Sequence, residues 1–274
     1  MRVPVVVVLL VSVVAACAGG SSPPVSGGDG CGGDDGDGHP AVDGSPPATA
    51  DGGPPSGAPS GGYVKLERYT SGGETSLLAL AELDSGHTGP GRLPATFYQS
   101  FPIDSCFQVP LLPEEPSSYD FVDVGAAIGL DGPATIDLTR EILLGNIFYR
   151  ARPDDILPGD YAVSLGAALR VPPPPQLLAP DISSGSAVIG PSIALSWEPV
   201  GADHLFAVLQ QDSIGRVCHL ADDGSFELPA DAAAGVPAWG TLAFVALNVD
   251  TVDVGGRAVE LLGIQGKVAD YERP

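Results

Sequence analysis

The sequence is poor in positive charge and in histidine. Twelve Lys and Arg residues stand against 34 Asp and Glu residues, which gives a formal net charge of -22 at pH 7. A surface of this charge repels nucleic-acid phosphates and anionic lipid headgroups, so we expect no nucleic-acid partner. The four histidines, His39, His87, His204 and His219, are scattered along the chain. Their spacing predicts neither a metal site nor a cofactor.

Motifs of catalysis are missing as well. The chain contains no G-x-S-x-G nucleophile elbow, no H-E-x-x-H, no C-x-x-C and no phosphate-binding Walker loop. Gly28, Gly30 and Gly33 match G-x-G-x-x-G, but no strand pattern precedes them and no helix pattern follows. Glu114 and Glu115 lie between prolines in an expected exposed loop, where nothing apolar is near to raise a carboxyl pKa. We therefore expect no enzymatic activity and no catalytic residue.

The first residues have the pattern of an export signal. Arg2 supplies a positive charge, and residues 3–14 form an apolar run that only Pro4 and Ser12 interrupt. The run is too short to span a bilayer core, which needs about 20 apolar residues. Its length is that of the apolar part of a signal peptide.

A cysteine follows two small residues at the end of this run, in Val-Ala-Ala-Cys at residues 14–17. The motif resembles the lipobox of bacterial lipoproteins, and the whole chain is similar to the lipoproteins of high-GC bacteria. The resemblance implies that residues 1–16 are a removed signal peptide and that Cys17 carries acyl chains such as palmitate, which anchor it durably in a membrane. Ala18 stands where an aspartate would favour inner-membrane retention, so the outer membrane is expected. A plain secretory signal and a retained membrane helix are the alternatives.

Residues 17–62 have the composition of a disordered linker. Beyond Cys17 this stretch has no aromatic residue, no Lys and no Arg, and it is rich in Gly, Pro and Asp. Such a composition cannot bury enough apolar surface to offset the entropy of ordering, so the folded part is expected to stand off the membrane on a tether. The acidic run at 29–39 is similar to a calcium loop, but no Glu closes it, and a solvated tether is favoured over calcium binding.

From residue 63 onward, short alternating runs are separated by Gly, Pro and Asp, which predicts strands. The expected fold class is all-β, with two antiparallel immunoglobulin-like β-sandwich domains at 63–171 and 176–274. The prolines between them, at 172–175, favour a stiff connection. A single continuous sandwich with these prolines on an edge strand is the alternative.

The strands predicted from these runs are short. Asp223-Gly224 predicts a tight hairpin turn, and the Ala-rich residues 229–235 predict a helical turn. Strands are predicted at 63–69, 76–83, 95–98, 106–109, 121–124, 134–139, 146–151, 161–165, 193–197, 205–211, 217–221, 225–228, 241–249 and 258–264.

Two stretches carry the resemblance to immunoglobulin-like domains. Residues 157–163, Leu-Pro-Gly-Asp-Tyr-Ala-Val, resemble the turn and late strand where a tyrosine ring packs inward and its hydroxyl bonds the neighbouring corner. A generic Pro-Gly turn is the alternative, and Tyr161 is expected to be structural in both cases. Residues 193–199 resemble the second strand of a fibronectin type III module, which implies that Trp197 anchors the core.

Three cysteines remain after Cys17, namely Cys31, Cys106 and Cys218. In an oxidising compartment this odd number leaves at least one thiol free or paired with another chain. Because Cys31 lies in the linker, the disulfide we expect joins Cys106 to Cys218. His219 would point to the strand face opposite Cys218, so these two neighbours make a poor metal site.

One aromatic residue has two readings. Trp239 is expected to pack in the core or where a strand begins, with stacking on carbohydrate as the alternative.

The expected function is that of a non-enzymatic structural or interaction module, attached to the outer membrane by its lipid and meeting a protein partner in the cell envelope. An extracytoplasmic binder of a small ligand, glycan or calcium is the alternative.

Overall fold

Strands make up most of this computed structural model, which describes residues 60–84, 101–110, 121–143, 145–211 and 214–274. The expected all-β class is confirmed. All described residues fall within one compact unit. The expected signal peptide, Cys17, Cys31 and the expected strand at 95–98 lie outside the described residues. No described helix has both the length and the apolar character needed to cross a bilayer.

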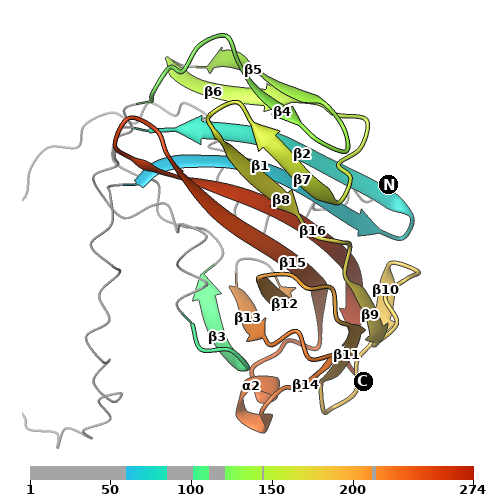
Figure 1. Cartoon of the computed structure of the whole chain (residues 1–274). Coiled ribbons are helices and arrows are strands. Elements are labelled where there is room, and N and C mark those ends of the chain that lie inside the picture. Colours follow the sequence, from blue (N-terminus) through green and yellow to red (C-terminus); the bar gives the residue numbers. More distant parts are fainter. Residues whose placement is uncertain (1–59, 85–100, 111–120, 144, 212–213) are drawn as a thin grey trace, which may run out of the picture. The chain divides into compact units, whose positions relative to one another are not determined.

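The first half of the described chain consists of strands (Figure 1). They are β1 (Ser60–Ser71), β2 (Glu74–Leu83), β3 (Ser105–Pro110), β4 (Ala127–Asp131), β5 (Ile136–Leu143), β6 (Asn146–Ala151), β7 (Gly159–Val163) and β8 (Ala167–Val171).

The second half adds a short helix and two long strands. Its elements are β9 (Gln176–Ala179), β10 (Ser186–Val188), β11 (Ala194–Glu198), β12 (His204–Gln211), β13 (Ile214–Leu220), β14 (Ser225–Glu227), α2 (Ala230–Ala234), β15 (Trp239–Asp253) and β16 (Ala258–Glu272).

One sheet joins strands from both halves. Among the described residues it has thirteen strands, in the order β3-β13-β12-β15-β16-β1-β2-β6-β5-β4-β7-β8, with β10 beside β16. The pairing of β1 with β16 is parallel and matches Val64 with Leu261. The two separate antiparallel immunoglobulin-like sandwiches expected at 63–171 and 176–274 are therefore not confirmed, because the first strand of one range and the last strand of the other are hydrogen-bonded neighbours.

The first core forms where this sheet curls over itself. β8 contacts β15 and β16 as well as its neighbour β7, and Figure 1 shows β7 and β8 crossing over the central strands. Burial alternates along β5, where Ile136 and Leu138 are buried and Asp137 and Thr139 are exposed. The curled sheet covers the apolar side of this strand. The first core consists of Val64, Leu66, Ala79, Ala81, Leu83, Ile128, Leu130, Ile136, Leu138, Tyr149, Ile156, Tyr161, Val163, Leu169, Val171, Val259 and Leu261.

A glycine makes the curling possible. A Cβ atom placed on Gly263 of β16 would lie 2.1 Å from the carbonyl oxygen of Arg170 in β8. The two backbones approach so closely that no other residue fits without a shift of the strands. The carboxylate of Asp203 accepts two hydrogen bonds from the Arg170 guanidinium, at 2.6 and 2.7 Å, beside this contact.

The second core lies between the large sheet and a three-stranded sheet of β9, β11 and β14. Trp197 of β11 is 3% exposed, which agrees with its expected place in the core. Its indole N–H donates to Asp222 Oδ1 at 3.1 Å, and its ring lies 5.4 Å from that of Phe244. The prolines at 172–175 connect the two sheets between β8 and β9.

The other face of the large sheet is also buried. This second face carries Tyr63, Leu80, Phe206, Val208, Val217, Ala243, Val245, Leu247, Leu262 and Ile264. Residues 242–248 of β15 are buried without interruption, since their side chains enter the second core and the second face alternately. A strand buried on both faces has a continuous apolar run in place of alternation.

The tyrosine corner that the resemblance implied is present. Tyr161 is fully buried, its hydroxyl donates to Leu157 O at 3.0 Å, and the Leu157 N–H donates back to it at 3.2 Å. The ring thereby ties β7 to the turn that precedes it.

Several local expectations are wrong. Residues 121–124 form no strand beyond an isolated bridge of Phe121 with Asp84. The turn at Asp223-Gly224 does not join paired strands, because β13 pairs with β12 and β3 while β14 pairs with β11. Strands β4, β8, β9 and β10 were not expected. The helical turn within residues 229–235 is confirmed as α2.

Candidate functional site

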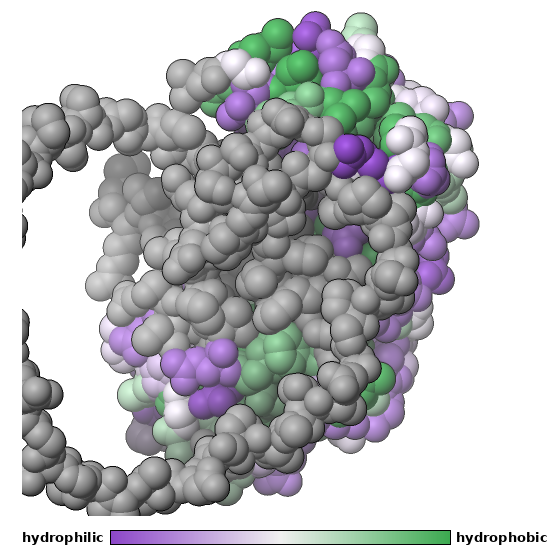
Figure 2. Space-filling model, turned by 90° about the vertical axis from the view of Figure 1, so that its left-hand side faces the viewer, coloured by the Kyte–Doolittle hydropathy of each residue, from purple (hydrophilic) through white to green (hydrophobic). Residues whose placement is uncertain are grey.

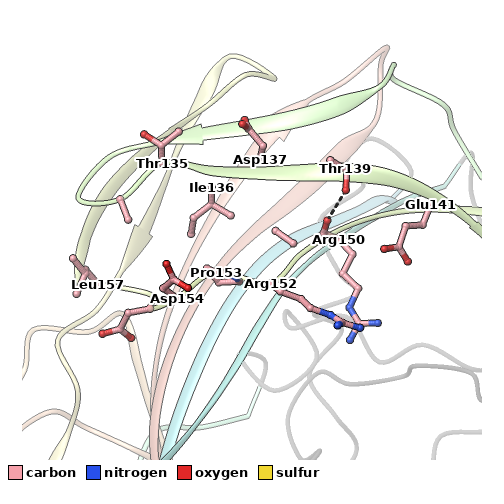
Figure 3. Close-up of a pocket in the computed structure, with 13 residues that line it drawn as sticks. Thr135, Ile136, Asp137, Thr139, Glu141, Arg150, Arg152, Pro153, Asp154 and Leu157 are labelled. Carbon is pink, nitrogen blue, oxygen red and sulfur yellow. Dashed lines mark hydrogen bonds between the residues drawn. The ribbon is translucent and has the colours of Figure 1, made fainter.

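A groove of about 670 Å³ lies on the outer side of β5 and β6 (Figure 3). Because Ile136 and Leu138 point into the first core, the alternate residues of β5 point outward and line the groove. The segment that follows β6 forms the other side. The polar lining consists of Thr135, Asp137, Thr139, Glu141, Arg150, Arg152, Asp154 and Asp155.

Charges of both signs meet in this groove. Arg150 pairs in register with Thr139, whose hydroxyl donates to the Arg150 carbonyl oxygen at 3.2 Å, as the dashed line in Figure 3 shows. This bond ties the two strands and leaves the Arg150 guanidinium exposed. Arg152 is exposed beside it, with Asp154 on the same segment. The groove can therefore bind a polar group of either charge by hydrogen bonds and ion pairs.

Asp155 is the most constrained carboxylate of the groove. Its Oδ1 accepts from Arg68 Nε at 2.8 Å and from the Ile156 N–H at 2.8 Å. The hydrogen bond from Arg68, followed by that from the backbone, holds the pKa of Asp155 below its usual value. A carboxylate held ionised in this way is a poor proton donor, and the described lining contains no His and no Cys. Asp155 is therefore suited to accepting hydrogen bonds and cations.

Two of the scattered histidines meet on the second face. His204 Nδ1 lies 3.1 Å from His219 Nε2, and His219 Nδ1 lies 2.9 Å from the carbonyl oxygen of Phe101. Because that carbonyl only accepts, His219 carries its proton on Nδ1 and accepts from His204 through Nε2. Burial, and then the neighbouring His219, lower the pKa of His204.

This histidine pair links β12, β13 and Phe101 and has the character of a packed core element. The His219 ring stacks on Phe206 with centroids 4.9 Å apart. Within the described residues neither imidazole is hydrogen-bonded to a carboxylate or to a nucleophilic side chain. The same residues contain no group of three or more His, Cys, Asp or Glu side chains that could hold a metal ion.

Cys106 and Cys218 are joined by a disulfide, as expected from the sequence. They are register partners on β3 and β13, with their α-carbons 4.0 Å apart and a sequence separation of 112. Cys218 points into the second core, whereas His219 points to the second face. The expectation that these neighbours face opposite ways is confirmed.

A buried ion pair was missed by the sequence reasoning. Lys65 Nζ lies 2.9 Å from Glu67 Oε1, and the two side chains are 0% and 5% exposed. The ammonium group also lies 5.4 Å from the centre of the Tyr63 ring. Lys65 and Glu67 alternate with Val64 and Leu66, and this pattern by itself indicates that the two charged side chains are exposed to solvent. Both side chains are buried on the second face of the large sheet, and nothing in the sequence of β1 indicates this burial.

Trp239 lies at the first position of β15 and is 57% exposed. It begins a strand as expected, but it does not pack in the core. Figure 2 shows hydrophilic and hydrophobic residues interspersed over the described part of one face of the molecule.

No protein family, curated protein or solved structure matches the chain.

Proposed function

We propose that the protein is a lipid-anchored lipoprotein of the cell envelope that acts outside the cytoplasm as a non-enzymatic interaction module. The observation that carries this proposal is the disulfide between Cys106 and Cys218. Disulfides persist in the oxidising compartments that follow export and are rare in the cytosol. The disulfide thus agrees with the export signal and with the Val-Ala-Ala-Cys motif at residues 14–17.

The described fold supports binding more than catalysis. The groove lies beside the paired strands β5 and β6, which carry Asp137, Glu141 and Arg150, while the segment after β6 carries Arg152, Asp154 and Asp155. Polar partners of the cell envelope can bind there through Arg150, Arg152 and the carboxylates around them. In this proposal the outer membrane is the site of attachment, and the Gly-, Pro- and Asp-rich residues before β1 separate the groove from Cys17 along the sequence.

The test compares Cys17→Ser with the matched variant Cys31→Ser in the native host. The wild type and Cys31→Ser are expected to partition into the detergent phase and to sediment with outer membranes. Cys17→Ser is expected to remain uncleaved or to appear in the aqueous phase, because it lacks the acylated sulfur. Detergent-phase partitioning of a cleaved Cys17→Ser variant would show that lipidation at this residue is wrong.

A further inference from the structure

Trp239 exposes an unusually large aromatic surface. It is 57% exposed, whereas the chain's other tryptophan, Trp197, is 3% exposed. Removing an aromatic side chain from water is favourable, so a tryptophan held at the surface indicates a binding role more often than a smaller apolar residue does. The neighbours of Trp239 in the sheet specify what could bind.

Three adjacent strands present one row of side chains here. Trp239 of β15 is the register partner of Glu272 in β16, and Glu272 is the register partner of Val188 in β10. Val188 is 74% exposed, and Glu272 is exposed between the two apolar side chains. Register partners point to the same face of a sheet, so the three side chains form a flat surface with a carboxylate at its centre.

The next row adds a second carboxylate. Asp270 of β16 pairs with Thr241 of β15 and with Ser186 of β10, and its side chain is exposed. Neither Asp270 nor Glu272 forms an ion pair with another described residue. We name the six residues Trp239, Glu272, Val188, Asp270, Thr241 and Ser186 the tryptophan platform.

The platform stands on a rigid support. The backbone N–H of Arg273 donates to Ala238 O at 2.6 Å, which extends the ladder past Trp239. The Arg273 guanidinium donates to the carbonyl oxygens of Ala233, Val236 and Pro191, at 3.0, 2.9 and 3.1 Å. These bonds tie the segment that precedes the tryptophan to the end of the chain beside β16, so ordering this backbone adds little to the entropy cost of binding.

We propose that the tryptophan platform binds neutral glycans, with a β-linked pyranose ring stacked on Trp239. A pyranose with equatorial hydroxyls has a flat face of C–H groups that matches the exposed indole, and its rim of hydroxyls can donate to Glu272 and Asp270. The two carboxylates and the net charge of -22 repel uronic acids and other anionic sugars. The ligand class is therefore a neutral chain of hexoses or N-acetylhexosamines.

A cationic ligand fits this surface less well. Quaternary ammonium groups are recognised by cages in which several aromatic rings surround the cation. Trp239 is the aromatic side chain of the platform, and its register neighbours are aliphatic or carboxylate. The flat indole of Trp239, with the carboxylates of Glu272 and Asp270 beside it as acceptors for sugar hydroxyls, favours a flat pyranose ring.

This inference rests on the proposed role as an interaction module and names the class of its partner. Its test uses purified full-length protein in detergent, and lipidation at Cys17 does not enter the readout. Failure of glycan binding would leave the anchoring proposal standing, and failure of anchoring would leave glycan binding standing.

The experiment titrates the protein with chitohexaose and cellohexaose while tryptophan fluorescence and its quenching by acrylamide are followed. Since the chain has two tryptophans and Trp197 is buried, the quencher reports chiefly on Trp239. Binding is expected to protect the wild type from quenching. By calorimetry, Trp239→Ala is expected to weaken binding by about tenfold or more, and Glu272→Gln by a smaller factor.

The matched control is Ile142→Ala, because Ile142 is 60% exposed on β5, outside the platform. Ile142→Ala is expected to bind both oligosaccharides like the wild type. Trp239→Phe keeps an aromatic ring and is expected to retain part of the affinity, so it distinguishes loss of the aromatic surface from misfolding of Trp239→Ala. The proposal is overturned by equal binding of Trp239→Ala and wild type, by the absence of wild-type binding to either oligosaccharide, or by preferential binding of hyaluronan or tetramethylammonium.

Discussion

Truncation of Trp197 tests the packing between the two sheets. The side chain is 3% exposed in the second core, so Trp197→Ala removes a large buried group and is expected to lower the free energy of unfolding by about 3–5 kcal/mol. Trp197→Phe keeps a ring beside Phe244 but leaves Asp222 Oδ1 without its indole donor. Its expected cost is about 1–3 kcal/mol, since a hydrogen bond to a charged group is lost.

The exposed tryptophan provides the control for this measurement. Urea unfolding followed by far-UV circular dichroism gives a midpoint for each variant. With a slope of about 3 kcal/mol per molar urea, Trp197→Ala is expected to lower the midpoint by about 1 M or more. Trp239→Ala is expected to change it by only about 0.2 M, because surface substitutions cost about 0.5 kcal/mol or less. Similar midpoints for Trp197→Ala and wild type would refute the placement of Trp197 between the sheets.

Three further outcomes follow from the described contacts. Replacing Cys106 and Cys218 by serine is expected to cost about 4–5 kcal/mol by loop entropy, and a midpoint that reductant leaves unchanged in the wild type would contradict this. Gly263→Ala forces a Cβ against β8 and is expected to cost about 1–3 kcal/mol in urea unfolding, whereas Gly190→Ala meets nothing closer than 3.6 Å; equal midpoints would refute the close approach of the strands. The lowered pKa of His204 makes the unfolded chain take up a proton first, so stability is full above pH about 6.5 and falls as pH decreases through the folded pKa. His204→Asn is expected to flatten this fall, and an unchanged slope of midpoint against pH would count against the contribution of the half-buried His204.

Local pattern predicted much of the secondary structure. Alternation placed β2, β5 and β6 close to their observed positions, and the Pro-Gly turn before Tyr161 predicted the bonded corner. Strands β8 and β9 were missed because small residues and prolines weaken the alternating signal around them.

The order of the strands could not be predicted from local pattern. The parallel pairing of β1 with β16 joins residues almost two hundred positions apart, and nothing in either strand specifies the other. The same long-range packing buries Lys65 and Glu67, whose alternation with apolar residues indicated exposure. The groove and the tryptophan platform also depend on which strands are neighbours. The sequence around Trp239 therefore left core packing and carbohydrate stacking as open alternatives.

The most direct test of the central claim is mass spectrometry of the mature N-terminus from membranes of the native host. Lipid anchoring predicts that the chain begins at Cys17 and that this residue carries a thioether-linked diacylglyceryl group, with or without a further acyl chain on its amino group. A chain that begins at Met1, or a mature Cys17 without lipid, would contradict the account.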